Sequence, residues 1–161
     1  MHAMMGSQVK SLLLIASQLS GYPIPADPPP VVTEVTRVEM AIDECGGGDP
    51  LSVLTCPLLG FYEWPVAVGE NPKIPGRAER LWILDEGESE ESANAIAVHE
   101  LTHWLQWHNG FHPTQCPELF QVEYQAYTVT LKYKVMYENY QIPEAYGVPG
   151  VSCPTQPEKT K

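Results

Sequence analysis

The chain has 161 residues, of which 43% are hydrophobic and 18% are charged, and these values fit one globular domain with a hydrophobic core. The formal net charge of −11 argues against nucleic acid as a partner, because binding to phosphates requires a basic surface. No apolar run in the sequence is long enough to span a membrane.

The N-terminal region is predicted to contain a tail followed by a helix. Residues 1–7 (MHAMMGS) are expected to be a disordered tail or a remnant of an expression vector. The apolar stretch after Lys10 weakly resembles the core of a signal peptide, but polar residues interrupt it. We therefore predict a first helix at 8–20, ended by Gly21, and then an extended proline-rich linker at 22–30.

Short runs rich in β-branched and aromatic residues predict three strands, at residues 31–35, 58–68 and 80–84. Pro65 assigns the second strand to the edge of a sheet or to a bulge. A helical turn is expected up to residue 43, a loop at 45–50 and a turn at 71–76.

The four cysteines are Cys45, Cys56, Cys116 and Cys153, and they form no C-x-x-C pair, which argues against a structural zinc site. An even number allows two disulfides. Pairing Cys45 with Cys56 and Cys116 with Cys153 closes the shorter loops, although three connectivities are possible. Disulfides slightly favour an exported protein, periplasmic or secreted, and four reduced thiols in a cytoplasmic protein are the alternative.

The most informative stretch is residues 93–109, ANAIAVHELTHWLQWHN, which contains the pattern H-E-x-x-H at 99–103. Residues four apart share one face of a helix, so His99 and His103 can bind a single metal ion. Glu100 lies beside that face, where it can act on a water bound to the metal. The alternative is two surface histidines on an ordinary amphipathic helix.

The residues around this pattern predict one uninterrupted helix. No Pro or Gly occurs from 89 to 109, and Gly110 stands where a helix is expected to end. Ser89 or Ser92 can cap the start, where nearby acidic residues favour the helix dipole. A second face is apolar and is expected to pack in the core, and it consists of Val98, Leu101 and Leu105.

A catalytic zinc site needs a third protein ligand, and four candidates follow the pattern: His108, His112, Glu118 and Glu123. The metzincin pattern fails, because Gln106 and Asn109 stand where it requires Gly and His. His108 lies too far round and too far along the helix to share the ion. His112, beyond the turn, suits a supporting group or a transition-state donor better than a ligand.

The long helix predicted at 118–140, which contains no Pro or Gly, offers the better ligand. Glu118 falls in its first turn, where an acid stabilises the helix dipole. Glu123 falls in the middle of the helix, and the small Ala126 would let this helix pack closely on the H-E-x-x-H helix. Glu123 is therefore the favoured third ligand, while Glu118 and His112 stay open.

H-E-x-x-H on one helix followed by a Glu on the next resembles the gluzincin class of zinc metallopeptidases, and the short chain resembles a minimal member, a minigluzincin. Three segments also resemble an uncharacterised bacterial family, the DUF6647-like proteins: YPIP at 22–25, HELTHWLQ at 99–106, and Cys-Pro at 116–117 ahead of EYQAY at 123–127. These resemblances imply a Zn²⁺ site formed by His99, His103 and Glu123, with Glu100 as the base. Gluzincins often carry Asp where Tyr127 stands.

The expected fold class is α+β, with a single minimal zincin-like domain at 8–140. In such a domain a small, mostly antiparallel sheet packs on the H-E-x-x-H helix and on the following helix that carries the Glu ligand. Residues 141–161 are expected to form a proline-rich tail that Cys153 could tie down.

The predicted function is that of a zinc metallopeptidase that hydrolyses a peptide or protein substrate through a water activated by Glu100. Tyr127 is the favoured donor to the oxyanion, with His112 and Tyr62 as rivals and a plain core position as the alternative. Two other functions stay open: an inactive zinc-binding or regulatory module, and a zinc amidohydrolase that acts on a different amide.

Two strands and two tryptophans close to the predicted site could contact a substrate. In H-E-x-x-H enzymes a strand beside the active-site helix often binds the substrate backbone, and the strand at 58–68 or 80–84 could do so by strand addition. The alternative is that both strands belong to the core. Trp104 and Trp107 are expected mainly to pack, with a place in a substrate pocket as the alternative.

Overall fold

The computed structural model describes residues 2–64, 79–85, 92–113 and 116–142. Within these ranges the chain folds into β1 (His2–Ala3), α1 (Gly6–Ser20), β2 (Val32–Val35), α2 (Arg37–Glu44), α3 (Pro50–Thr55), β3 (Gly60–Glu63), β4 (Arg80–Leu84), α4 (Ala93–His108) and α5 (Cys116–Tyr137). Three predicted regions fall wholly or largely outside the described residues: the end of the strand at 58–68, the turn at 71–76 and the tail at 141–161.

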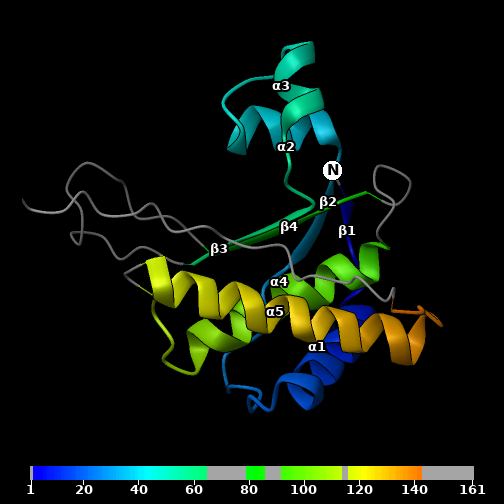
Figure 1. Cartoon of the computed structure of the whole chain (residues 1–161), viewed down its shortest axis with the longest axis vertical. Coiled ribbons are helices and arrows are strands. Elements are labelled where there is room, and N and C mark those ends of the chain that lie inside the picture. The colour runs from blue at the N-terminus through cyan, green and yellow to red at the C-terminus, as the bar shows by residue number, and fades with distance from the viewer. Residues whose placement is uncertain (1, 65–78, 86–91, 114–115, 143–161) are drawn as a thin grey trace, which may run out of the picture.

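The four strands form one mixed sheet in the order β1-β2-β4-β3, with helices on both faces (Figure 1). β4 pairs with β2 in parallel and with β3 antiparallel, and β1 pairs antiparallel with β2. The α+β class is confirmed, and two of the three pairings are antiparallel, as expected for a mostly antiparallel sheet. The central parallel pairing was not predicted. β3 lies at the edge of the sheet, one of the two positions that Pro65 favours.

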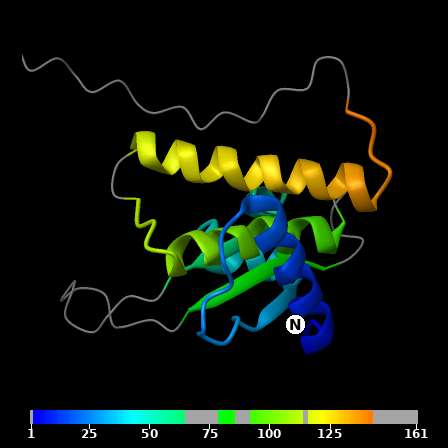
Figure 2. The same ribbon diagram turned by 90° about the horizontal axis from the view of Figure 1, so that it is seen from below.

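Helix α4 lies between the sheet and helix α5, and α1 packs beside both helices (Figure 2). α5 runs antiparallel to α4, since Gln125 contacts Gln106 while Glu138 contacts Ser92. The predicted apolar face of α4 is confirmed, because three of its side chains have no exposed surface: Val98, Leu101 and Leu105. The face of α4 that carries His99, Glu100 and His103 is thereby held towards α5 and β3.

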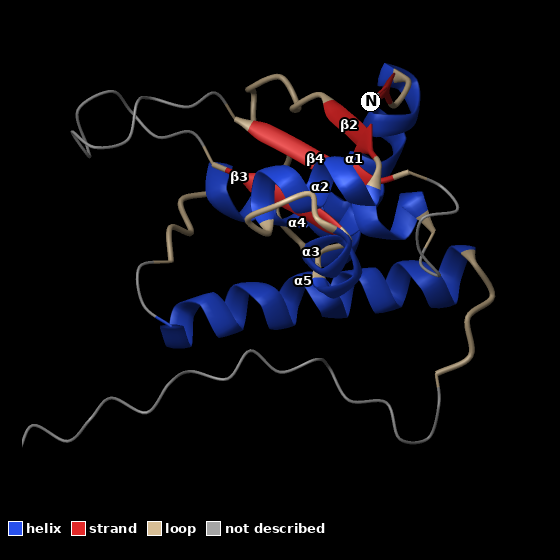
Figure 3. Ribbon diagram, turned by 90° about the horizontal axis from the view of Figure 1, so that it is seen from above, coloured by secondary structure: helices blue, strands red, loops and turns tan. Residues whose placement is uncertain are grey.

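Strand β4 is the most buried strand because both faces of the sheet are covered (Figure 3). Leu81 and Ile83 join the core shared with α1 and α4. Trp82 and Leu84 point to the other face, where they pack with Met40 of α2. The sheet therefore separates two hydrophobic cores.

The N-terminus and helix α3 also differ from the sequence prediction. Residues 2–3, expected in a disordered tail, pair with β2, and α1 begins at Gly6 rather than at residue 8. Helix α3 was not predicted, because it has six residues and follows a glycine-rich loop. Asp49 caps α3 by accepting the N–H groups of Leu51 and Ser52, and a proline occupies its first turn.

Cys45 and Cys56 form a disulfide, which belongs to the pairing that closes the shorter loops, one of the three left open by the sequence, and it joins the C-terminal ends of α2 and α3. The other predicted pair, Cys116 with Cys153, rests on side chains outside the described part of the chain. Among the described helices, none is both long enough and apolar enough to cross a membrane.

Candidate metal centre

Helix α4 presents His99 and His103 on one face, a single turn apart. Ser92 begins the helix, and its hydroxyl accepts the N–H of Ala95 at 3.0 Å. The helix ends just before Gly110, whose φ of +85° is a conformation that glycine adopts without strain. Both ends are therefore set by local sequence, and the two histidines fall well inside the helix.

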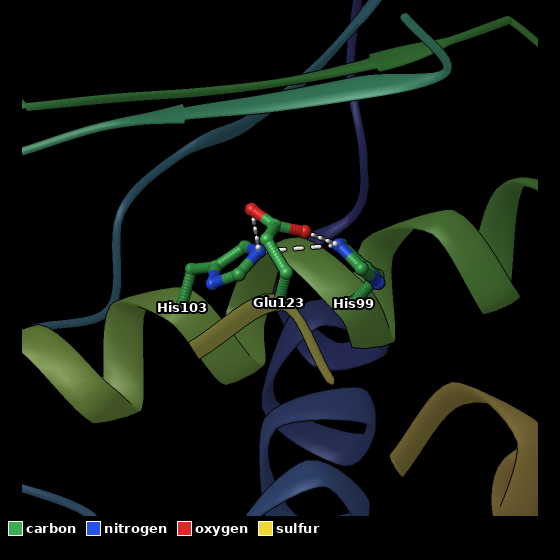
Figure 4. Close-up of side chains that lie close together, drawn as sticks. All are labelled: His99, His103 and Glu123. Carbon is green, nitrogen blue, oxygen red and sulfur yellow. Dashed lines mark hydrogen bonds and ion pairs between the residues drawn. The ribbon is translucent and has the colours of Figure 1, made fainter. Parts of the chain in front are cut away.

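The three predicted ligands come together, with the ring nitrogens of two histidines facing a carboxylate from α5 (Figure 4). The Nε2 atoms of His99 and His103 are 3.1 Å apart. The carboxylate oxygens of Glu123 lie 3.5 Å from Nε2 of His99 and 3.4 Å from Nε2 of His103. One ligand atom from each residue lies within 4.8 Å of the other two. Two imidazoles and one carboxylate are a donor set that could hold a divalent metal ion.

The other candidates for a third ligand lie elsewhere. His108 contacts Glu79 at 2.8 Å and Asp27 at 3.3 Å. His112 stacks on Trp107 and contacts its backbone oxygen at 3.0 Å. Glu118 belongs to none of the groups that could hold a metal among the described residues, where the cluster of His99, His103 and Glu123 is the one found.

Glu100 lies beside the ligands and is 6% exposed. Burial raises the pKa of its carboxyl group above the usual range, and the charges of His99 and His103 oppose this increase. The backbone N–H of Tyr62 in β3 donates to the Glu100 carboxylate. This approach requires glycine at position 60, because a Cβ there would lie 2.6 Å from Oε1 of Glu100.

The candidate ligands Glu123 and His103 shift each other's pKa. Burial raises the pKa of the Glu123 carboxyl group, but contacts with His103 and His99 outweigh burial and hold that pKa well below its usual range. For His103 the directions are reversed: burial lowers its pKa, and the carboxylates of Glu123 and Glu100 raise it. The net shift of the His103 pKa is upward. The site therefore favours positive charge between the two rings and the carboxylate.

The three candidate ligands line a cleft with a volume of about 660 Å³. One wall is formed by β3 and the residues just before it, the other wall by α5, and the floor by α4. The lining contains mostly apolar side chains apart from the site residues, among them Leu58, Phe61, Trp64, Ile96, Leu119 and Leu131. The volume and apolar lining are those of a site that could hold a small molecule or a short peptide segment.

The aromatic residues considered in the sequence have different positions. Tyr127 lines the cleft, and its ring meets the ring of His99 with centroids 4.6 Å apart. The hydroxyl of Tyr62 lies 2.6 Å from a carboxylate oxygen of Glu79 and is engaged there. Trp104 has no exposed surface, in line with its predicted packing role. Trp107 stacks on Trp64. Trp64 also lines the cleft, and the sequence analysis did not predict this role.

Sequence reasoning also missed the residues behind the histidines. Oε1 of Gln106 lies 2.9 Å from Nδ1 of His103, and Oγ1 of Thr130 lies 3.4 Å from Nδ1 of His99. Gln106 follows His103 by three residues, so helix geometry alone could have indicated this contact. Thr130 comes from α5 and could be found only with the packing of the two helices known.

No protein-family model matches the chain, and comparison with curated proteins and with solved structures finds no similar protein. Function must therefore be argued from the chemistry of the site itself.

Proposed function

We propose that the protein is a zinc metallopeptidase of the gluzincin type, with a minimal zincin-like domain. The observation that supports this most strongly is the convergence of two Nε2 atoms and a carboxylate in one cleft, with the buried Glu100 carboxyl group beside them. His99, His103 and Glu123 would hold Zn²⁺, because two His and one Glu match the ligands of catalytic zinc sites.

Zinc bound at this site would polarise a substrate carbonyl and lower the pKa of a bound water. Glu100 would accept a proton from the attacking water and then donate it to the leaving amine. Its position suits both transfers, since it lies next to the histidines at the floor of the cleft.

Tyr127 is the best placed of the three proposed oxyanion donors. It lines the cleft with its ring against the ring of His99, so it lies directly beside a proposed metal ligand. His112 does not line the cleft in the described part of the chain. A hydroxyl at Tyr127 would stabilise the negative charge that develops on the attacked carbonyl oxygen.

The substrate that fits this cleft best is a peptide with large apolar side chains. Large apolar side chains line the cleft from β3 with its flanking residues and from α5, among them Leu58, Trp64, Leu119 and Leu131. The edge strand β3 forms one wall, and it could pair with a substrate backbone by strand addition. The Cys45–Cys56 disulfide supports export of the protein to an oxidising compartment.

An inactive metal-binding module is less well supported. A structural zinc site is usually closed by four protein ligands, whereas a catalytic site has three and an open position. Within the described residues, three candidate ligands converge, and they face the cleft. A structural site would also have no need of a buried carboxyl group at Glu100.

The first test is zinc content, measured by elemental analysis on protein purified without an immobilised-metal column. The wild type should bind about one zinc per chain, and His103→Ala and Glu123→Ala should lose it. Glu118→Ala, which removes an acid from the same helix, is the matched control and should retain zinc. A wild type that binds no zinc after reloading would overturn the proposal, and zinc retained in Glu123→Ala would remove Glu123 from the site.

A second test separates a peptidase from other amidohydrolases. The zinc-loaded protein should cleave members of a peptide library with apolar residues at the scissile bond. Cleavage should stop in Glu100→Gln while zinc remains bound. Hydrolysis of simple amides without any peptide cleavage would favour the amidohydrolase.

A further inference from the structure

Two neutral side chains contact the histidine nitrogens that face away from Glu123. Gln106, which is 1% exposed, reaches Nδ1 of His103, and Thr130 reaches Nδ1 of His99. A neutral histidine carries its proton on one of two nitrogens, and only the other nitrogen can bind a metal. Partners at Nδ1 can therefore decide whether Nε2 is available as a ligand.

The orientation of the Gln106 amide follows from its other contacts. Its Nε2 atom lies 3.1 Å from the backbone oxygen of Val122 and 3.0 Å from Oε1 of Gln125. A backbone oxygen can only accept a hydrogen bond, so the NH₂ group of Gln106 must face Val122. Its Oε1 atom must then face His103, and because this oxygen can only accept, Nδ1 of His103 must carry a proton.

Gln106 is itself held in place by α5 and by the segment that follows α1. Both amide protons of Gln106 have acceptors on α5, at Val122 and Gln125. Oε1 of Gln125 also accepts from the hydroxyl of Tyr22 at 2.9 Å. These contacts keep the amide from rotating, so that Gln106 presents only its oxygen to His103.

The same reasoning applies to Thr130. Its hydroxyl donates to the backbone oxygen of Ala126 at 2.9 Å, which uses its single proton. Towards His99 the Thr130 oxygen can then only accept, so Nδ1 of His99 also carries a proton. This bond is the weaker of the two, since the two atoms are 3.4 Å apart.

We propose that Gln106 and Thr130 are positioning residues that hold His103 and His99 in the Nδ1–H form, so that both Nε2 lone pairs point at one metal ion. This inference rests on the metal site of the proposed function, although it does not require peptidase activity. Both supports are neutral, so the protein fixes the rings without placing a further negative charge behind them.

The first experiment measures zinc affinity by competition with a chromophoric chelator. Gln106→Met keeps the length of the side chain but removes its oxygen, and it should weaken zinc binding by roughly 10- to 100-fold. Gln106→Glu keeps an acceptor for His103 and should bind zinc at least as tightly as the wild type. Gln18→Met, at an exposed position of α1, is the matched control and should leave affinity unchanged.

These variants separate positioning from a purely structural role. If Gln106 acted only by donating to Val122, both variants would lose that bond and would weaken zinc binding equally. Equal losses in both variants, or no loss in Gln106→Met, would overturn the inference.

A second variant tests His99 and has an unusually close control. Thr130→Val should weaken zinc binding by roughly three- to tenfold, a smaller effect because its bond to His99 is longer. Thr128→Val removes the same kind of hydroxyl from the same helix, where it donates to the backbone oxygen of Tyr124 at 2.8 Å. Thr128→Val should leave zinc affinity unchanged, and equal losses in the two variants would remove Thr130 from the inference.

A spectroscopic measurement on the metal-free protein tests the inference without zinc. Ring-nitrogen chemical shifts, which distinguish the two neutral forms of a histidine from each other and from its charged form, should show the Nδ1–H form as the neutral form of His99 and His103 in the wild type. In Gln106→Met, His103 should populate the Nε2–H form, while His99 stays unchanged. The Nε2–H form of His103 in the wild type would overturn the inference.

The outcomes also distinguish this inference from the proposed function. A protein that binds zinc without peptidase activity would contradict the proposed function. The zinc affinities and the ring-nitrogen shifts would still decide whether Gln106 and Thr130 position the histidines. A protein that binds no zinc would contradict the metal site, and the nitrogen shifts would still report the Nδ1–H forms. If Gln106→Met fails to fold, Thr130→Val and the wild-type spectrum carry the test.

Discussion

On one face of the sheet lie three long helices, and on the other lie two short helices joined by a disulfide (Figure 1). The buried polar side chains among the described residues are Glu100, Thr102 and Gln106, and all three belong to α4 on the first face. On the second face, α2 and α3 expose several apolar side chains, including Leu51 and Leu54.

The difference indicates a division of roles between the two faces. A buried polar side chain is costly unless its hydrogen bonds are satisfied, so it is found where geometry must be fixed. The unit formed by α2, α3 and the Cys45–Cys56 disulfide has no comparable group among its described residues and contributes mainly by covering the sheet. We therefore expect substitutions on the first face to change chemistry and those on the second to change stability.

Glu100→Gln should give the largest effect. It preserves the shape of the side chain but removes the group proposed to transfer the proton, so kcat for peptide cleavage should fall by about 10³-fold. Zinc content should be unchanged, because Glu100 is not a ligand. Steady-state kinetics and elemental analysis on the same preparation would test this, and wild-type activity in the variant would exclude Glu100 as the base.

Tyr127→Phe should have the next largest effect on activity. Loss of the hydroxyl proposed to stabilise the oxyanion should lower kcat by about 10²-fold with little change in KM, because the proposed contact forms in the transition state. Tyr124→Phe, at an exposed position on the same helix, is the control and should be neutral. An increase in KM at constant kcat would instead assign Tyr127 to substrate binding.

Removal of the disulfide tests the second face. The double substitution Cys45→Ser and Cys56→Ser should lower the free energy of unfolding by about 2–3 kcal/mol, because the bond closes a short loop in the unfolded chain. Zinc affinity should stay within about twofold of the wild type. Denaturant titration and chelator competition would measure the two quantities, and a large loss of zinc affinity would show that the two faces are coupled.

The two faces also differed in how far the sequence predicted them. Helix α4 was predicted with Ser89 or Ser92 as its cap, of which the structure shows Ser92, and with its buried face at Val98, Leu101 and Leu105, because periodicity and capping are local signals. Helix α3 was missed because six residues are too few for a periodic pattern. The parallel pairing of β2 with β4 was missed because it joins segments far apart in the chain.

The candidate site shows the same limit. His99, Glu100 and His103 follow from one short motif, and Glu123 could be favoured because it lies mid-helix among few candidates. The contact from Thr130 could not be predicted, since it depends on the relative placement of α4 and α5. The close approach of Gly60 to Glu100 could not be predicted from the sequence either, because only the folded chain brings the two residues together.

Gly60→Ala should have the smallest effect of the four, and it acts where the edge strand β3 meets α4. The added Cβ would lie 2.6 Å from Oε1 of Glu100 and 2.7 Å from a methyl group of Ile96, so the Glu100 side chain must shift. We expect a loss of about 1–2 kcal/mol in the free energy of unfolding and a roughly tenfold fall in kcat, because the proton-transfer group is displaced. Gly6→Ala, where a Cβ would meet nothing within 4 Å, is the control.

A double substitution then identifies how Gly60→Ala acts. Gly60→Ala is expected to lower kcat by moving the Glu100 carboxylate. In the Glu100→Gln background that carboxylate is already absent, so adding Gly60→Ala should lower the residual activity far less than it lowers the activity of the wild type. Its cost in stability should persist in both backgrounds, since the steric contact with Ile96 remains. Equal tenfold losses in the two backgrounds would mean that Gly60 affects the cleft by another route, such as the β3 wall that the substrate is expected to contact.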